Sequence, residues 1–295
     1  MVGADDSDFV MTLRPMTTAD VMDVNDVVSA AADKERRARR PGIEATPQQR
    51  ERMREATTRF VERDPAGAWV AVGTGRVIGM AASIRRSSFW GLSMLFVDPE
   101  WQNRGVGHRL LDAASKYAED VAVRMILTSH DPRALRRYSL AGLTLHPSVE
   151  ASGVVDRSTI PPRLPGRHGD ATDLELVAEV DSSLGRSRAE DVGFLLSIDS
   201  RLEVLDARSG RGYVVYGDRG LQLLGATDES AAATLLWRYL AEVEGEAAIW
   251  TLTATQNWAV RVALAARLTV VPSGPLFVDG TDRPPGPWIP SGSYF

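Results

Sequence analysis

The segment "VDPEWQNRGVGHRLL" (residues 97–111) joins an apolar run to a predicted helix, with Gly105 and Gly107 at the junction. The start of a helix presents N–H groups and the positive end of the helix dipole, and glycine lets a bulky anion approach the backbone. The segment therefore indicates a turn able to hold a phosphate-bearing ligand, although such a turn is also a common structural device. It is not a dinucleotide fingerprint, which has three glycines, nor a P-loop, since no Gly-Lys-Ser/Thr follows.

Strand and helix patterns alternate on both sides of this turn. Apolar, β-branched runs predict strands at 9–17, 68–73, 76–84, 90–97 and 122–130. Helices are predicted at 18–32, up to about residue 63, from 106 past Ala118, and at 131–142, where Asp131 and Gly142 are the expected caps. The helix after the turn places on one face Val106, Leu110, Leu111, Ala114 and Ala118. This alternation predicts an α/β (α+β) protein of two or three layers.

The second half of the sequence repeats the first. "MILTSHDPRALRRYSLAGLTL" (125–145) aligns with "WTLTATQNWAVRVALAARLTV" (250–270) at a constant offset of 250 − 125 = 125 residues, which pairs Thr128 with Thr253. Asp98 and Asp228 match at 228 − 98 = 130, so the second copy is expected to be about five residues shorter at the glycine turn. Self-similarity at this distance indicates tandem domains. With the proline-rich stretch 156–169 as the linker, the expected domains are 1–155 and 170–295.

The two copies differ where the chemistry is expected. Gln102, Gly105 and Gly107 have no counterpart in the stretch 228–236, and Tyr138 aligns with Ala263. We therefore expect the second copy to keep the scaffold and to have lost the site.

Composition excludes several functions. The chain has no cysteine and four scattered histidines, His108, His130, His146 and His168, so no metal site is expected. A formal net charge of −5 argues against binding nucleic acid. The acidic start and the lack of an apolar run of membrane-spanning length favour a soluble, cytoplasmic protein with no membrane partner.

Two motifs in order resemble those of the GNAT superfamily of N-acetyltransferases. Residues 102–107, Gln-Asn-Arg-Gly-Val-Gly, match the family's Gln/Arg-x-x-Gly-x-Gly/Ala signature. Residues 134–143, "ALRRYSLAGL", match its Ala-x-x-x-Tyr-x-x-x-Gly-Phe pattern, with Leu143 in place of Phe. The resemblance covers residues 10 to 150 and implies two tandem GNAT-like domains, the second degenerate, each a twisted mixed sheet flanked by helices.

The resemblance also implies the ligand, acetyl-CoA, as cosubstrate. Backbone groups at the end of the strand before the turn would contact the pantetheine, and the amides of the turn would contact the pyrophosphate. The residues concerned are, for the pantetheine, Leu95, Phe96 and Val97, and, for the pyrophosphate, Gln102, Asn103, Arg104, Gly105, Val106, Gly107 and His108.

Acyl transfer from a thioester to an amine requires a deprotonated amine, donors for the oxyanion and a proton for the departing thiolate. A strand-edge N–H near Val97 is the expected oxyanion donor, and Tyr138 takes the acid role by its family position. Giving a proton from a tyrosine near pKa 10 to a thiolate near 8.5 is uphill by about 2 kcal/mol in water. The alternative is that Tyr138 is a core residue.

The general base stays open, because the strand 90–97, "WGLSMLFV", carries no carboxylate where many family members have a glutamate. His130, beside Asp131, is one candidate. The terminal carboxylate of Phe295 is another, by analogy with the enhanced intracellular survival type, a tandem-domain branch of the family. Deprotonation through water is the default.

Two functions stay in view, an N-acetyltransferase acting by direct attack on a small-molecule or peptide amine, and a non-catalytic acyl-CoA-binding sensor. The arginine-rich stretch from Lys34 to Arg54 is expected to be a solvated face, with an acidic acceptor or CoA phosphates as the alternative partner. Trp237, Trp250 and Trp258 are expected in the core. The acceptor, the acyl length and the choice between monomer and homodimer are not determined by the sequence.

Overall fold

The computed structural model of the chain describes residues 10–39, 46–218, 220–280 and 286–295. By its internal contacts the chain divides into two compact units. The first unit comprises residues 1–85 and 92–120, and the second comprises 86–91 and 121–295.

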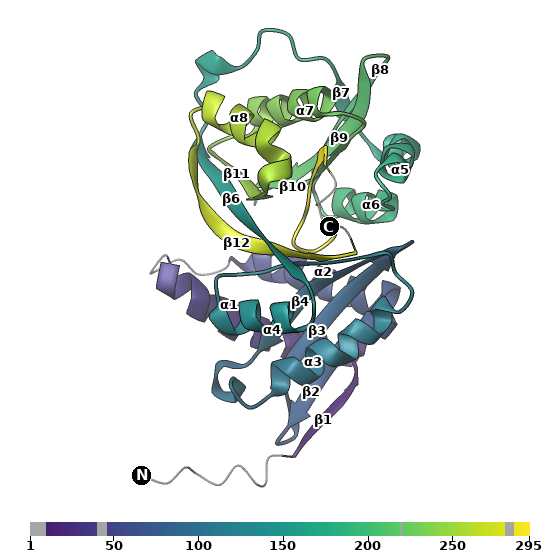
Figure 1. The fold of residues 1–295 in the computed structure, drawn as a ribbon, viewed down its shortest axis with the longest axis vertical. Helices are drawn as coiled ribbons and strands as arrows, with labels where there is room; N and C mark the ends of the chain where they lie inside the picture. The colour runs from purple at the N-terminus through teal and green to yellow at the C-terminus, as the bar shows by residue number, and fades with distance from the viewer. Residues whose placement is uncertain (1–9, 40–45, 219, 281–285) are drawn as a thin grey trace. The chain divides into compact units, whose positions relative to one another are not determined.

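The first unit is an antiparallel sheet covered by helices. Its elements are β1 (Met11–Pro15), η1 (Thr18–Asp20), α1 (Val21–Arg39), α2 (Pro47–Arg63), η2 (Pro65–Gly67), β2 (Ala68–Gly73), β3 (Arg76–Arg86), β4 (Phe89–Val97), η3 (Pro99–Trp101), α3 (Val106–Ser115) and η4 (Lys116–Ala118). The last residue of β3 and the first three residues of β4 belong to the second unit. The strands follow the order β1-β2-β3-β4. Figure 1 shows α3 in front of β2 to β4 and α2 behind them.

The β2–β3 hairpin and the helix α3 form as predicted. Thr74 and Gly75 turn the hairpin with φ of 51° and 80°, the left-handed values that a two-residue hairpin turn needs. α3 buries Val106, Leu110, Leu111, Ala113 and Ala114. A Cβ on Gly79 of β3 would lie 3.0 Å from Leu110, so this glycine lets α3 pack closely on the sheet. The helix ends at Ser115, earlier than expected, and Ala118 lies in the 3-10 turn η4.

The second unit contains more strands and two sheet segments. Its elements are β5 (Val123–Leu127), α4 (Pro132–Leu140), β6 (Thr144–Val154), η5 (Arg157–Thr159), β7 (Arg167–Gly169), η6 (Ala171–Asp173), α5 (Leu174–Ser183), α6 (Ala189–Ser197), β8 (Arg201–Ala207), β9 (Gly210–Gly217), β10 (Gly220–Ala226), α7 (Glu229–Glu242), β11 (Glu246–Leu252), η7 (Ala254–Gln256), α8 (Asn257–Ala265), β12 (Thr269–Asp279) and β13 (Trp288–Ile289). One segment has the order β5-β12-β6-β11, and the other β13-β10-β9-β8-β7. α5 and α7 both pack against β9 and β10, from different sides of the sheet (Figure 1).

The predicted repeat is confirmed by the order of the elements. Apart from further 3-10 turns, which differ between them, both copies run strand, 3-10 turn, two helices, three strands, helix, strand, helix, strand, from β1 to β6 and from β7 to β12. The offset of 125 residues relates α4 to α8 (257 − 132) and β6 to β12 (269 − 144). Between the third strand and the next helix, the first copy has residues 98–105 and the second only 227 and 228. The second copy is therefore shorter at the glycine turn, by six residues rather than five.

A further repeated feature is an ion pair at the start of each copy. In the first copy the Arg14 guanidinium contacts the Asp20 carboxylate at 2.6 Å, and in the second copy Arg167 contacts Asp173 at 2.5 Å. The two pairs lie 153 residues apart in the sequence (167 − 14 and 173 − 20), and each aspartate completes a capping box at a 3-10 turn. The repeat thus extends to the first strand of each copy, beyond the segments that align in sequence.

The last strands of the two copies are exchanged within the second unit. β12 pairs antiparallel with β5 and with β6, while β6 pairs with β11. The first copy's β5, α4 and β6 therefore belong to the same compact unit as the second copy, and the compact units divide at residue 121, while the predicted domains 1–155 and 170–295 stay a prediction. Within the stretch 156–169, residues 167–169 form β7, and Arg167 is the counterpart of Arg14 in β1.

One expected core residue lies at the surface. Trp258 is buried and Trp237 packs against the core, as predicted, whereas Trp250 is 45% exposed. Trp250 lies on β11, the end strand of its sheet segment, where the register with β6 shifts between Ile249 and Leu252. The irregular pairing, with Thr251 at a φ of 57°, turns the indole out of the core.

Candidate functional site

The helix α3 begins without a side-chain cap. Its N-cap residue, Gly105, has a φ of 79° and no side chain to accept a hydrogen bond from the first turn. A Cβ built on Gly105 would meet no atom within 4 Å, so the space in front of the turn is open. The first amides of a helix lack the usual partner within it, and those of α3 lie at the positive end of the helix dipole. This arrangement suits a phosphate group.

The predicted cofactor residues of the turn have different roles in the structure. Gln102 donates from its side-chain Nε2 to the backbone oxygen of Val97 at 3.2 Å, which holds the turn against the end of β4. Asn103 adopts a φ of 66°. The Arg104 guanidinium stacks on the Trp101 ring, with its Cζ atom 5.0 Å from the ring centroid. The backbone N–H of His108 donates to the Gly105 oxygen at 3.1 Å, so this amide is already engaged inside the helix.

The last residues of β4 differ from the rest of that strand. Leu95, Phe96 and Val97 are each half-buried, whereas most residues of β4 before them are fully buried. Asp98 follows them and is held by Arg76 at 2.7 Å while it caps the turn η3. The strand end and the glycine turn are thus fixed to one another by Asp98 and Gln102.

Tyr138 lies on α4 and is almost fully buried, at 5% exposure. Its ring packs edge-on against Phe277 with centroids 5.6 Å apart, and its hydroxyl hydrogen-bonds to the side chain of Thr128. Burial raises the pKa of Tyr138 to about 12. The hydroxyl is therefore protonated at neutral pH, which suits a proton donor and excludes a role as a base.

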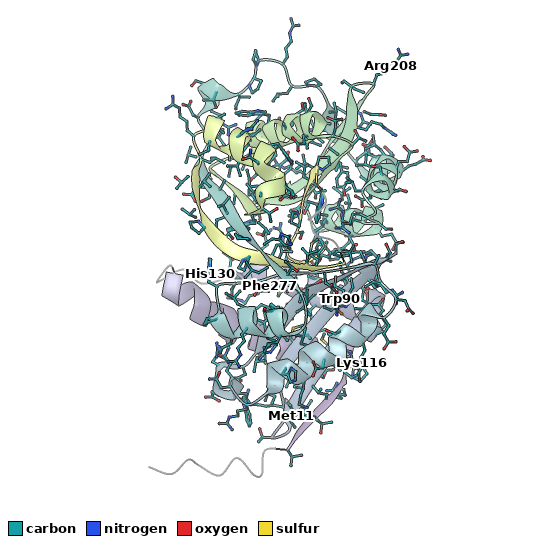
Figure 2. The ribbon with its side chains drawn as sticks, viewed as in Figure 1. Met11, Trp90, Lys116, His130, Arg208 and Phe277 are labelled. Atoms are coloured by element: carbon teal, nitrogen blue, oxygen red, sulfur yellow. The ribbon has the colours of Figure 1, made fainter. Side chains whose placement is uncertain are left out.

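His130 is the first candidate for the base. It is exposed at the end of β5 (Figure 2). Asp131, the partner that its position in sequence offers, binds the Arg133 guanidinium at 2.6 Å and caps α4. This carboxylate therefore serves the helix and Arg133, and nothing in the described geometry raises His130 above the other candidates for the base.

The C-terminal segment is docked in the second unit. Trp288, Ile289 and Phe295 are fully buried, and the Phe295 ring packs on Phe89 with centroids 5.6 Å apart. Its main-chain oxygen accepts a hydrogen bond from Arg188 Nη1 at 3.2 Å. Phe295 is thus a packed residue, and its role as a base stays a prediction.

The second copy has no glycine turn and no uncapped helix start. Its helix α7 is capped by the Asp228 carboxylate, which accepts hydrogen bonds from the amides of Ser230 and Ala231 at 2.9 Å. The edge of β10 is also taken, because β13 pairs with Leu224 and Gly225. The Asp228 carboxylate thus lies at the helix start that is uncapped in the first copy, and β13 pairs with the strand before it.

Sequence reasoning missed Thr128 as a partner of Tyr138. The repeat alignment pairs Thr128 with Thr253, which indicates scaffold, and in the second copy Thr253 indeed caps the turn η7. Only the contact with the tyrosine hydroxyl gives Thr128 a place beside the candidate acid.

The arginine-rich stretch from Lys34 to Arg54 lies partly outside the described residues. The part on α2 is exposed or half-buried, and Arg54 pairs with Glu51 at 2.7 Å within the helix. This part is solvated, as expected. Across the described ranges, no three His, Cys, Asp or Glu side chains are grouped to hold a metal ion, and no helix has the length and apolarity to cross a membrane.

Comparisons with known proteins agree with this architecture. The model of the acetyltransferase (GNAT) family matches residues 32–142. A candidate acetyltransferase from Pyrococcus horikoshii superposes with a TM-score of 0.77 at 16% identity, over 97% of this chain and 96% of the other. A GCN5-related N-acetyltransferase from Sphaerobacter thermophilus has a TM-score of 0.58 at 17% identity, over 91% and 95%.

A tandem GNAT protein from the clavulanic acid biosynthesis pathway superposes with a TM-score of 0.58 at 16% identity, over 93% of this chain and 100% of that one. At such identities the superpositions describe the fold. No curated protein matches the sequence.

The duplicated α/β fold is the fold of these solved structures. Residues 32–142, in the first copy, match the model of the acetyltransferase (GNAT) family, and the duplicated fold superposes on a tandem GNAT protein.

Proposed function

We propose that the chain is an acetyl-CoA-dependent N-acetyltransferase whose acceptor is a primary amine of a small molecule or peptide. The observation that carries the proposal is the uncapped start of α3. Gly105 leaves open space and no side-chain cap at the start of α3, where we place the pyrophosphate, whereas Asp228 caps the equivalent helix in the second copy. The first copy is therefore the proposed catalytic one.

The reaction is direct attack of the amine on the thioester carbonyl. A C–N bond forms, the C–S bond breaks, and the amine loses a proton, through water by default or to His130 or the Phe295 carboxylate. A strand-edge N–H near Val97 is the proposed donor to the oxyanion. Backbone groups of Leu95 to Val97 are the proposed contacts of the pantetheine.

Tyr138 is the proposed acid that returns a proton to the thiolate. Its raised pKa, about 12, widens the gap to a thiol near 8.5 in water. Donation therefore requires that the thiolate is also desolvated, which raises the thiol pKa and narrows the gap. The Thr128 hydroxyl holds the tyrosine hydroxyl in place for this step.

A matched pair of glycine substitutions tests the cofactor site. Gly105 and Gly75 have φ of 79° and 80°, and a Cβ at either position meets nothing within 4 Å. Gly105→Asp and Gly75→Asp therefore place the same side chain on the same backbone conformation, one at the start of α3 and one at the β2–β3 turn. Calorimetric titration should show that acetyl-CoA affinity falls by at least about tenfold in Gly105→Asp, because its carboxylate caps the amides and repels the phosphates.

The Gly75→Asp variant should bind acetyl-CoA as the wild-type protein does. If both variants and the wild type bind acetyl-CoA with equal affinity, the glycine turn is not part of the acetyl-CoA site. Since the chain has no cysteine, thiol release can be followed without background from the protein.

A non-catalytic acyl-CoA-binding sensor is the second candidate. The observation that favours it is the lack of a carboxylate on β4, which leaves the amine without an assigned base. Thiol release that requires an added amine separates the two functions. A chain that binds acetyl-CoA and releases no thiol across a panel of small amines and peptides is the sensor.

A further inference from the structure

Tyr138 is supported by β12, a strand of the second copy. Its ring packs edge-on against Phe277 of β12 (Figure 2), and Phe277 is fully buried. Its hydroxyl hydrogen-bonds to the Thr128 side chain, and the Thr128 backbone N–H donates to the Pro275 oxygen of β12 at 3.3 Å. The ring and the partner of the hydroxyl therefore both rest on the same strand.

The strand β12 is irregular where it meets Thr128. Its pairing with β6 shifts register between Ser273 and Leu276. Gly274 and Pro275 lie at the shift, opposite a single residue of β6, and form a β-bulge. Bulges of this kind are over-represented next to active sites, where they redirect the groups beside them.

The bulge fits closely against the end of β5. A Cβ built on Gly274 would overlap the backbone oxygen and carbon of Thr128, so a side chain here would displace the end of β5. The Gly274 oxygen accepts a hydrogen bond from the Ser148 hydroxyl of β6 at 2.8 Å, and Ser148 is buried. The bulge therefore sets the position of the Thr128 backbone, and β6 holds the bulge.

The repeat provides a comparison, because β6 pairs with β11 as β12 pairs with β5. The offset of 125 residues aligns residues 274–275, Gly-Pro, with residues 149–150, Val-Glu. In the second copy Ala263 stands where the first has Tyr138. The Gly-Pro pair thus belongs to the strand beside the copy with the tyrosine, and the Val-Glu pair to the strand beside the copy without it.

We propose that the bulge of Gly274 and Pro275 positions the candidate acid, because by fixing Thr128 it holds the Tyr138 hydroxyl where it can donate a proton. Gly274 and Pro275 are positioning residues, since they act through Thr128. The inference rests on the proposed function, in which Tyr138 is the acid. It adds that the second copy, which has no glycine turn, supplies part of the surroundings of the first copy's acid.

The variant Gly274→Ala tests the proposal, with Gly280→Ala as the matched control. Gly280 lies at the other end of the pairing between β12 and β5, and a Cβ there would overlap the Ala122 oxygen in the same way. Gly280 also has a φ of 87°, so its alanine variant carries additional backbone strain. Both variants disturb the contact of β12 with β5, but only Gly274→Ala does so beside Tyr138.

The kcat of thiol release should fall about tenfold in Gly274→Ala, since a small displacement of a catalytic group is costly to the rate. The acetyl-CoA affinity of this variant should equal that of the wild type, because the glycine turn is unchanged. Gly280→Ala should lose at least as much stability in urea unfolding and keep the wild-type kcat. A wild-type kcat in Gly274→Ala, or an equal loss of kcat in both variants, overturns the proposal.

A milder pair of variants, Ser148→Ala and Ser273→Ala, covers the case that Gly274→Ala does not fold. The two serines are equivalent in the repeat, since 273 − 148 = 125. Ser148 donates to the Gly274 oxygen, and Ser273 donates to the Glu150 carboxylate at 3.0 Å. Ser148→Ala should lower kcat about threefold, the effect of losing one weak hydrogen bond, and Ser273→Ala should not. An equal kcat in the two variants contradicts the proposal.

A spectroscopic measurement separates failure of this inference from failure of the proposed function. With isotopically labelled tyrosine, the NMR signal of Tyr138 Cζ is assigned by its loss in Tyr138→Phe. The signal should shift in Gly274→Ala as it does in Thr128→Val, which removes the hydrogen bond, and should not shift in Gly280→Ala. These shifts in a chain that releases no thiol would reject the acetyltransferase and retain the bulge as the element that positions Tyr138. An unshifted signal in Gly274→Ala overturns the inference at any level of activity.

Discussion

Gly105 and Asp228 stand at the N-cap of equivalent helices and fill that position in opposite ways. Gly105 leaves the amides of α3 uncapped, while the Asp228 carboxylate binds two amides of α7. Comparing the two copies therefore distinguishes residues that maintain the fold from residues of the candidate site. What the two copies share holds the fold together, and what only the first copy has is the candidate chemistry.

Acetyl-CoA should bind to one site per chain. Asp228→Gly should not create a second site, because β13 still pairs with Leu224 and Gly225 of β10. Calorimetric titration of the wild type and of Asp228→Gly measures the stoichiometry directly. A count of two in the wild type would mean that the second copy has kept a working site.

Tyr138→Phe should lower the rate of acetyl transfer by about 100-fold, the usual range for loss of a general acid, while acetyl-CoA affinity changes little. Thr128→Val is the matched control, because it removes the hydrogen bond and keeps the tyrosine hydroxyl. Its rate should fall much less. Steady-state thiol release measures the rate of acetyl transfer, and calorimetry measures the acetyl-CoA affinity. If Tyr138→Phe transfers acetyl at the wild-type rate, Tyr138 is a core residue without a catalytic role.

Stability should depend on the Arg14–Asp20 pair at acid pH. The hydrogen bonds from Arg14 lower the pKa of Asp20 to about 2 from an ordinary value of 3.8. A carboxyl whose folded pKa is lowered contributes stability that is fully present above its unfolded pKa and is lost as the pH falls through the folded value. The contribution of Asp20 should therefore disappear between about pH 4 and pH 2.

Asp20→Asn isolates this contribution. The variant should be less stable than the wild type by about 1 kcal/mol at neutral pH, since it keeps only part of the cap. The difference should shrink toward pH 2 in urea unfolding. A constant difference across that range would show that the charge of Asp20 is not involved.

Gly91→Ala should destabilise the protein by about 1 to 3 kcal/mol, the usual cost of overpacking. A Cβ at this position would lie 2.4 Å from the Phe295 ring. Phe295→Ala removes the ring, so in the double variant Gly91→Ala should add little further cost. Urea unfolding of the four proteins in this cycle measures the coupling, and additive costs would show that Phe295 does not dock against Gly91 in solution.

Local patterns were enough to predict much of the fold. Alternation predicted β2, β3 and β4, and the caps Asp131 and Gly142 placed α4. The offset of 125 residues predicted the second copy before any strand was seen to pair. These signals are local because they depend on side-chain periodicity and on backbone conformations that neighbouring residues impose.

The candidate site was predicted only in part. The glycine turn could be predicted because a helix start without a side-chain cap is visible in the order of residues. Sequence did not indicate that Gln102 would use its side chain on Val97, nor that Thr128 would bond to Tyr138. Such contacts depend on which strand ends come together, and many alternative pairings satisfy the same local pattern.

The sequence by itself determined the α/β class, the duplication, the glycine turn of the first copy and its loss from the second. Tertiary structure alone decided the exchange of β6 and β12, the pairing of β13 with β10, and the burial of Arg186. Strand order and charge pairing are settled by contacts between residues far apart in the chain. Hydrophobic periodicity states which side of an element is buried, but not against what it is buried.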